Sequence, residues 1–147
     1  MTRIELNVIL RKLSNIKKYL AQLQTKADLS RADYAEDFEQ QLVVERLLHL
    51  LVESAADINS HIAVNSDQTP PDTYRDSFLL LGKMGVLSSD LAQQLAPVAG
   101  LRNRLVDDYD DIDNAIVYKS IAFALSLFPQ YLQQVQAHLK KANGAEI

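Results

Sequence analysis

The stretch RADYAEDFEQQLVVERLLHLLVESAADINSHIAV, residues 31–64, decides the fold class because it contains neither glycine nor proline. Apolar side chains recur along it at spacings of three and four, which is typical of an amphipathic helix. We predict one helix of roughly 30 residues across this stretch, and its length implies a spine against which other helices pack. The predicted apolar stripe consists of Tyr34, Phe38, Leu42, Leu48, Leu51, Ala55, Ile58 and Ile62.

The flanking segments follow the same pattern. A leucine stripe predicts a helix over about 3–25, separated from the long helix by a break at 27–30. The clearest loop is 65–72, which contains two consecutive prolines that disfavour helix. The next predicted helix begins after a cap at Asp72 or Thr73, and glycines at 82 and 85 are expected to end it.

Two further helices complete the chain. Ser88 and Ser89 are expected to cap a helix that continues to about 105, with Pro97 inside it. Asp113 is expected to cap a last helix over about 114–142, in which Pro129 predicts a kink. Strand-like alternation is not visible. We therefore predict an all-α, up-and-down bundle of four to five helices, forming a single domain over 1–147 with its core over 3–142 and a short C-terminal tail.

Composition narrows the function classes. The chain of 147 residues carries 15 Lys and Arg against 19 Asp and Glu, a net charge of −4, which argues against a sequence-blind nucleic-acid coat. Cysteine is absent from the sequence, which removes disulfides, thiol nucleophiles and cysteine-based zinc sites. The longest strongly apolar stretch, residues 120–128, is too short to span a bilayer, and we expect a cytoplasmic protein without a membrane partner.

One segment differs from ordinary bundle sequence. Residues 101–113 read LRNRLVDDYDDID, in which two arginines precede five aspartates within seven residues. Aspartates near a helix C-terminus oppose the helix dipole, so the acidic run needs a reason. It could be a solvated turn between helices, or a metal site resembling the aspartate-rich motif of prenyl-diphosphate enzymes. That motif requires a second acidic motif, which is not found here, and we expect no metal.

A third interpretation rests on a resemblance. Arg102, Asn103 and Tyr109 stand in the spacing of the signature of HEPN ribonucleases of the HepT branch, in which an Arg, four residues, a His, one residue and a Tyr follow one another. Asp107 occupies the position of the His. Residues 45–62, 71–78 and 85–87 also resemble the second and third helices of that branch, so the resemblance covers about 3–140.

The resemblance implies an RNase toxin of a two-gene toxin–antitoxin pair. HepT proteins are similar to one another in cleaving RNA without a metal or other cofactor, with tRNA as a substrate class. They act as dimers or higher homo-oligomers, in which motif-bearing helices of two protomers line one cleft. The partner is a MntA-like nucleotidyltransferase that transfers AMP to the motif tyrosine, here Tyr109. The resemblance also places Arg102, Asn103 and Arg104 against RNA.

The chemistry of the motif can be judged independently. Cleavage without a metal needs a proton acceptor, a proton donor and a cation for the charge that builds on phosphate. Arg102 suits the cation role, because its planar fork grips phosphate at two points. Asp107 does not suit proton transfer as His does, because an ionised carboxylate has no proton to donate and repels phosphate. We therefore predict a weak or inactive nuclease.

Two alternatives remain open. A nuclease-dead HEPN module could still sequester its nucleotidyltransferase or RNA. An all-α, Mg-dependent nucleotide pyrophosphohydrolase would use acidic pairs such as Glu36 with Glu39, but the second pair, Glu53 and Asp57, misses the required spacing. The three histidines, His49, His61 and His138, do not pair with one another at metal-binding spacing, and we interpret each as a structural or surface residue.

Overall fold

The computed structural model describes residues 1–107 and 113–143, with the backbone alone at residue 4 and at 102–107. The described residues form six helices and no strand. The helices are α1 (Arg3–Gln24), α2 (Arg31–Glu36), α3 (Phe38–Asn65), α4 (Tyr74–Lys83), α5 (Ser89–Asp107) and α6 (Asn114–Asn143).

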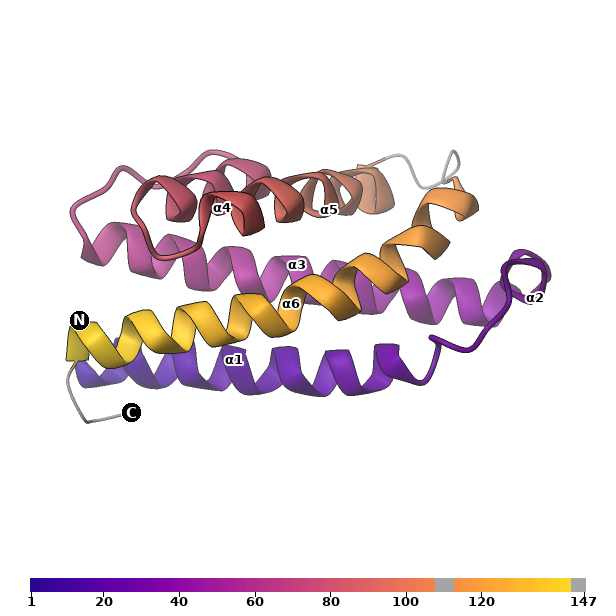
Figure 1. The fold of residues 1–147 in the computed structure, drawn as a ribbon, viewed down its shortest axis with the longest axis horizontal. Helices are drawn as coiled ribbons and strands as arrows, with labels where there is room; N and C mark the ends of the chain where they lie inside the picture. Colours follow the sequence, from indigo (N-terminus) through magenta and orange to yellow (C-terminus); the bar gives the residue numbers. More distant parts are fainter. Residues whose placement is uncertain (108–112, 144–147) are drawn as a thin grey trace.

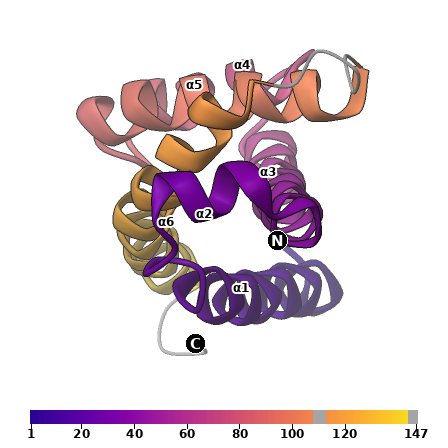
Figure 2. The same cartoon turned by 90° about the vertical axis from the view of Figure 1, so that its right-hand side faces the viewer.

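The long helices lie side by side along one axis, and the chain reverses direction between α1 and α3 and again between α5 and α6 (Figure 1). The predicted all-α, up-and-down arrangement is therefore confirmed. Buried side chains from all six helices form one continuous hydrophobic cluster, in which Ile9, Leu51, Phe78, Leu95 and Phe128 are fully enclosed. Seen from one end, α2 lies across the gap between α3 and α6 (Figure 2).

Most predicted helix ends are confirmed by their caps. Thr2 and Glu5 form a reciprocal capping box at the start of α1. The Ser88 hydroxyl accepts the backbone N–H of Leu91, and Asp113 Oδ1 accepts the N–H two residues later at the start of α6, 2.9 Å away. These side chains satisfy amide donors that have no partner inside a helix, which fixes where each helix begins.

The prediction of one helix over 31–64 is wrong, and this raises the count from four or five helices to six. Asp37 has extended backbone angles and separates α2 from α3. Its Oδ1 accepts the backbone N–H of Gln40, so it acts as the N-cap of α3. An Asp side chain competes with helix for these backbone groups, and it begins a new helix where the apolar pattern alone suggested continuity.

The break changes which side chains are buried at the start of α3. Phe38 is 60% exposed and Leu42 is 42% exposed, although both belong to the predicted apolar stripe. The buried stripe begins instead at Val44 and continues through Leu48 and Leu51. Leu42 and Leu48 are six residues apart, which places them about 120° away from each other around a helix. The first turns of α3 therefore turn apolar side chains outward.

We predicted that Gly82 would end its helix, and this is wrong because Gly82 lies inside α4. A Cβ added there would stand 2.7 Å from the Cβ of Ala92, so the glycine permits the close approach of α4 and α5. The chain leaves the helix at Gly85, whose φ of +79° favours glycine.

A buried polar chain joins three helices. The Tyr131 hydroxyl on α6 lies 2.7 Å from Asn59 Oδ1 and 3.0 Å from the Ala55 carbonyl oxygen, both on α3. The Asn59 amide donates in turn to the Ser77 hydroxyl on α4, at 3.0 Å. All three side chains are buried, so these bonds satisfy polar groups that water cannot reach.

Among the described helices, α6 alone is long and apolar enough in composition to cross a membrane. Ten residues of α6 are nevertheless buried inside the bundle. The core helix of a protein that does not enter a membrane can be equally long and apolar. The helix is bent in Figure 1, and Pro129 near its middle removes an amide donor, as the predicted kink requires.

Candidate functional site

The predicted motif lies where α5 ends. The structure places Arg102, Asn103, Arg104 and Asp107 in the last two turns of that helix, and Asp107 is its final residue. Their side chains lie outside the described part of the chain, and so does Tyr109, which falls in the segment 108–112. The backbone thus supports the predicted placement of the basic residues on one helix, in front of the acidic run.

The end of a helix has an electrostatic preference. Carbonyl groups without partners give a helix C-terminus partial negative charge, which favours cations and opposes anions. Arg102 and Arg104 therefore suit their position in the last turns of α5, whereas a carboxylate at Asp107 does not. A histidine in the same place would carry its proton more readily, because the dipole stabilises the imidazolium.

Directly beside the motif, α5 and α6 enclose an open apolar groove of about 400 Å³. Leu101, the residue before the motif, lies at its wall. The exposed rim includes Phe123, with 58% of its surface accessible, and Ile116, with 39%. The residues that define this α5–α6 groove are Pro97, Val98, Leu101, Ile116, Lys119 and Phe123.

The first turns of α6 contact α2 and the turn that precedes it. The Tyr118 hydroxyl donates to the Leu29 carbonyl oxygen at 2.7 Å, and its ring lies 5.6 Å from the ring of Tyr34. Tyr34 is buried, and its hydroxyl has no hydrogen-bond partner among the described residues. Burial raises the pKa of Tyr34, with a smaller contribution from the Glu45 carboxylate, so the phenol stays neutral.

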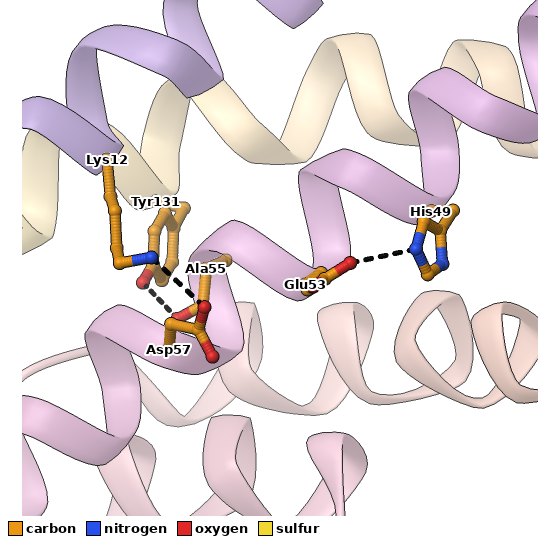
Figure 3. Close-up of polar contacts among 6 residues, drawn as sticks. All are labelled: Lys12, His49, Glu53, Ala55, Asp57 and Tyr131. Atoms are coloured by element: carbon orange, nitrogen blue, oxygen red, sulfur yellow. Dashed lines mark hydrogen bonds and ion pairs between the residues drawn. The ribbon is translucent and has the colours of Figure 1, made fainter.

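None of the three histidines lies on the helix that carries the motif. His49 Nε2 lies 2.8 Å from Glu53 Oε2, one turn further along α3 (Figure 3). His61 and His138 belong to the C-terminal parts of α3 and α6, at the end of the bundle opposite the last turn of α5 (Figure 1). Burial lowers the pKa of His138, and the charge of Lys141 lowers it further.

The acidic residues of the pyrophosphohydrolase alternative are dispersed. Glu53 pairs with His49, and Asp57 pairs with Lys12 at 3.1 Å (Figure 3). Glu36 ends α2 and Glu39 lies in the first turn of α3, beside a separate hollow. Among the side chains that the structure describes, in 1–101 and 113–143, no three His, Asp or Glu residues stand close enough to hold one metal ion.

Sequence reasoning missed two surfaces, the α5–α6 groove and the exposed start of α3. Phe123 and Phe38 both sit in apolar patterns that ordinarily predict burial. One signal was available for α3, because the predicted stripe steps six residues from Leu42 to Leu48 and so does not stay on one helix face. No comparable signal marks Phe123, because α6 is apolar on more than one side.

A helical bundle with an Arg-Asn motif at the end of its fifth helix agrees with the HEPN ribonuclease class that the sequence resembled. Residues 9–135 match the Ribonuclease HepT-like family, and the chain belongs to that family. The resemblance that the motif indicated is therefore confirmed over most of the sequence.

Two relatives carry related names. The chain is 44% identical over 139 residues to a protein named tRNA nuclease HepT from Aphanizomenon flos-aquae, covering 95% of each. It is 28% identical over 131 residues to mRNA nuclease HepT from Shewanella oneidensis, covering 89% of this chain and 98% of that protein.

Solved structures show the same fold. The tri-AMPylated HEPN toxin of Shewanella oneidensis, determined in complex with its MNT antitoxin, superposes with a TM-score of 0.79 at 28% identity. The match covers 93% of this chain and 99% of that toxin. YutE from Bacillus subtilis, at 20% identity, gives a TM-score of 0.81 over 95% of this chain and 93% of YutE, which supports the fold alone.

Proposed function

We propose that this chain is the toxin of a two-gene toxin–antitoxin pair, a metal-independent HEPN endoribonuclease of the cytoplasm whose substrate is RNA, with tRNA as the expected class. The observation that carries the proposal is the 44% identity to a tRNA nuclease HepT along almost the whole of both chains. The motif spacing from Arg102 to Tyr109 supports it. The whole chain, 1–147, acts as one domain in this proposal.

The residues of the motif divide the work. Arg102 neutralises charge on the scissile phosphate, for which its two-point grip is suited. Asn103 and Arg104 bind and orient the RNA backbone. Asp107 occupies the position of the proton-transferring group, where an ionised carboxylate can neither donate a proton nor tolerate the nearby phosphate. The proposed chain is therefore a catalytically impaired form of its family's enzyme.

The proposed cleft requires a homodimer. The α5–α6 groove adjoins the motif through Leu101 and exposes Phe123, and an exposed apolar face of this kind is typical of a protein interface. Two copies that meet across the groove would bring the last turns of both α5 helices to the same cleft. The groove supports a dimer formed through the motif-bearing helices.

The partner in the proposal is a MntA-like nucleotidyltransferase that transfers AMP to Tyr109. The AMPylated toxin of Shewanella oneidensis in complex with its antitoxin supports this partner. AMP adds bulk and negative charge, which would repel RNA phosphate from the cleft. Incubation with this partner, ATP and Mg²⁺ should add mass in units of AMP. The added mass should be absent from Tyr109→Phe, and a label on Tyr118 or Tyr131 would contradict the assignment.

The nuclease proposal is tested by restoring the motif histidine. Total tRNA is incubated in EDTA with the natural chain and with Asp107→His. Because the helix C-terminus favours a cation, this substitution should leave folding intact. We expect cleavage by the His variant and little or none by the natural chain. Adding Arg102→Ala to Asp107→His should abolish the cleavage, because the phosphate loses its cation.

A second candidate function is a binding module without nuclease activity, which the carboxylate at Asp107 favours. If neither the natural chain nor Asp107→His cleaves tRNA while both bind the nucleotidyltransferase, the binding module is the better description. Mg-dependent release of pyrophosphate from nucleoside triphosphates would contradict both candidates.

A further inference from the structure

The corner where α2 meets α3 is strongly acidic. Between residues 28 and 45 the chain carries six acidic side chains and one basic one, more negative charge than the net −4 of the whole sequence. Four of the carboxylates surround an open hollow of about 510 Å³, and within the described residues none of the four forms an ion pair with a cation. The residues that define this acidic corner are Asp33, Glu36, Asp37, Phe38, Glu39 and Leu42.

Apolar side chains project from the same corner. Phe38 is 60% exposed, and Leu42 and Val43 are 42% and 43% exposed. Phe38 and Leu42 are four residues apart and share one face of α3. Exposed apolar side chains beside charged ones are typical of a protein interface.

The corner is held in place before any partner arrives. Gln41 Nε2 donates to the carbonyl oxygens of Tyr34 and Ala35, at 2.9 and 3.1 Å, which ties the end of α2 to the start of α3. Asp37 caps α3, and the ring of Tyr34 packs against Tyr118 of α6. A surface that is already ordered loses less conformational entropy on binding.

The charge of the corner selects its partner. Carboxylates repel the phosphates of RNA, so a nucleic acid is disfavoured there. A protein face that offers basic side chains around an apolar projection complements it. The corner also lies at the end of the bundle where α5 ends and α6 begins (Figure 2), the two helices between which Tyr109 falls in the sequence. An enzyme that modifies Tyr109 must bind close to that end.

We propose that the acidic corner is the docking surface for the nucleotidyltransferase antitoxin, which binds it through a face of basic side chains around an apolar group. This inference rests on the proposed function, since it assigns a location to the partner named there. It adds that recognition depends on α2 and the start of α3, which are separate in sequence from the motif.

The experiment measures the dissociation constant of the full-length chain for its cognate nucleotidyltransferase without ATP, so that binding is separated from AMP transfer. Phe38→Ser removes the apolar group, and Glu36→Lys with Glu39→Lys reverses two charges. Val64→Ser is the matched apolar control, because Val64 is 51% exposed at the far end of the same helix. Asp72→Lys is the charge control, on an exposed loop residue.

We expect each corner variant to raise the dissociation constant at least ~10-fold, the loss that removing one buried interface anchor commonly gives. The controls should stay within about twofold of the natural chain. Added salt should weaken binding of the natural chain more than binding of the charge-reversed variant, because fewer complementary charges remain to be screened. Circular dichroism verifies that every variant is folded.

Other results overturn the proposal in distinguishable ways. If the natural chain and the corner variants bind the nucleotidyltransferase equally well, the partner is correct and the location is wrong. If the corner variants instead lose self-association, the corner is occupied by a second copy of the chain. If they change only RNA binding, the corner belongs to the RNA face. If the natural chain neither binds the nucleotidyltransferase nor accepts AMP, the proposed function itself fails, and the docking surface with it.

Discussion

The proposed homodimer leads to a quantitative prediction at Phe123. This phenyl ring is 58% exposed at the rim of the α5–α6 groove, and the substitution Phe123→Ser removes it. A phenylalanine side chain offers about 200 Å² of surface, so about 120 Å² is available to a partner. At about 25 cal/mol per Å², its burial contributes about 3 kcal/mol per copy.

In a two-fold symmetric dimer both copies contribute, which gives an upper limit of about 6 kcal/mol. Because each 1.4 kcal/mol corresponds to a tenfold change in affinity, this limit is equivalent to about 10⁴-fold. Burial of half the exposed surface would still weaken self-association about 100-fold. We therefore expect Phe123→Ser to raise the dimer dissociation constant by a factor of about 10² to 10⁴.

Sedimentation equilibrium over a range of concentrations measures this change, as a shift of the apparent mass toward the 16.5 kDa of one chain. Phe38→Ser is a matched comparison, because Phe38 is 60% exposed on another surface. A dissociation constant within about threefold of the natural value, or an equal loss in both variants, would refute the assignment of the dimer to the groove. Thermal unfolding should be nearly unchanged, since an exposed side chain contributes little to the folded monomer.

Three stability predictions follow from buried or closely packed groups. Tyr131→Phe should destabilise the fold by about 1–3 kcal/mol, because it leaves the buried Asn59 acceptor without its donor. Tyr34→Phe should be neutral or stabilising, because the Tyr34 hydroxyl has no partner within the described chain. Urea unfolding of the two variants measures the difference. Gly82→Ala should lower the midpoint of thermal unfolding, because the added Cβ would meet Ala92 at 2.7 Å. The expected net loss of folding free energy is about 1–2 kcal/mol, which corresponds to about 2–8 °C. An unchanged midpoint would show that α4 and α5 move apart at little cost. Glu45→Gln should stabilise the fold at neutral pH, because burial raises the pKa of this carboxyl and its ionisation therefore destabilises the folded state as pH rises. Unfolding at several pH values measures the gain in stability. The gain should vanish in acid, where the natural side chain is also neutral.

The sequence was sufficient to predict the helices whose caps and apolar faces agree. The first helix and the last were expected over 3–25 and 114–142 and are found over Arg3–Gln24 and Asn114–Asn143. In both cases a capping side chain and a helical apolar period lead to the same boundary. At Asp37 these two signals conflict, because the apolar period continues while the capping side chain begins a new helix. The local hydrogen bond from the Gln40 N–H to the Asp37 carboxylate determines where α3 begins.

The family was predictable because residue identity carries that information, whereas the roles of the motif residues stay predictions. The Arg-Asn spacing from Arg102 identified the family, because chemistry fixes residue types at fixed intervals, and the family match confirms it. The groove could not be predicted, because exposure of Phe123 depends on how α5 docks against α6. Both helices carry enough apolar side chains to pack against each other in several orientations, and their sequences do not indicate which orientation is preferred.

Phe38 and Phe123 together support separate surfaces for the two proposed partners. Each ring is more than half exposed, although a phenylalanine in a bundle of this size is ordinarily buried. Phe38 is surrounded by carboxylates, whereas the described groove around Phe123 carries one charged side chain, Lys119. A symmetric interface places like charges against each other near its axis, so the groove with few charges suits self-association and the acidic corner does not. If the corner were the dimer contact, raising the salt concentration would strengthen the dimer by screening its carboxylates. We expect instead that salt leaves self-association nearly unchanged and weakens only the complex with the nucleotidyltransferase.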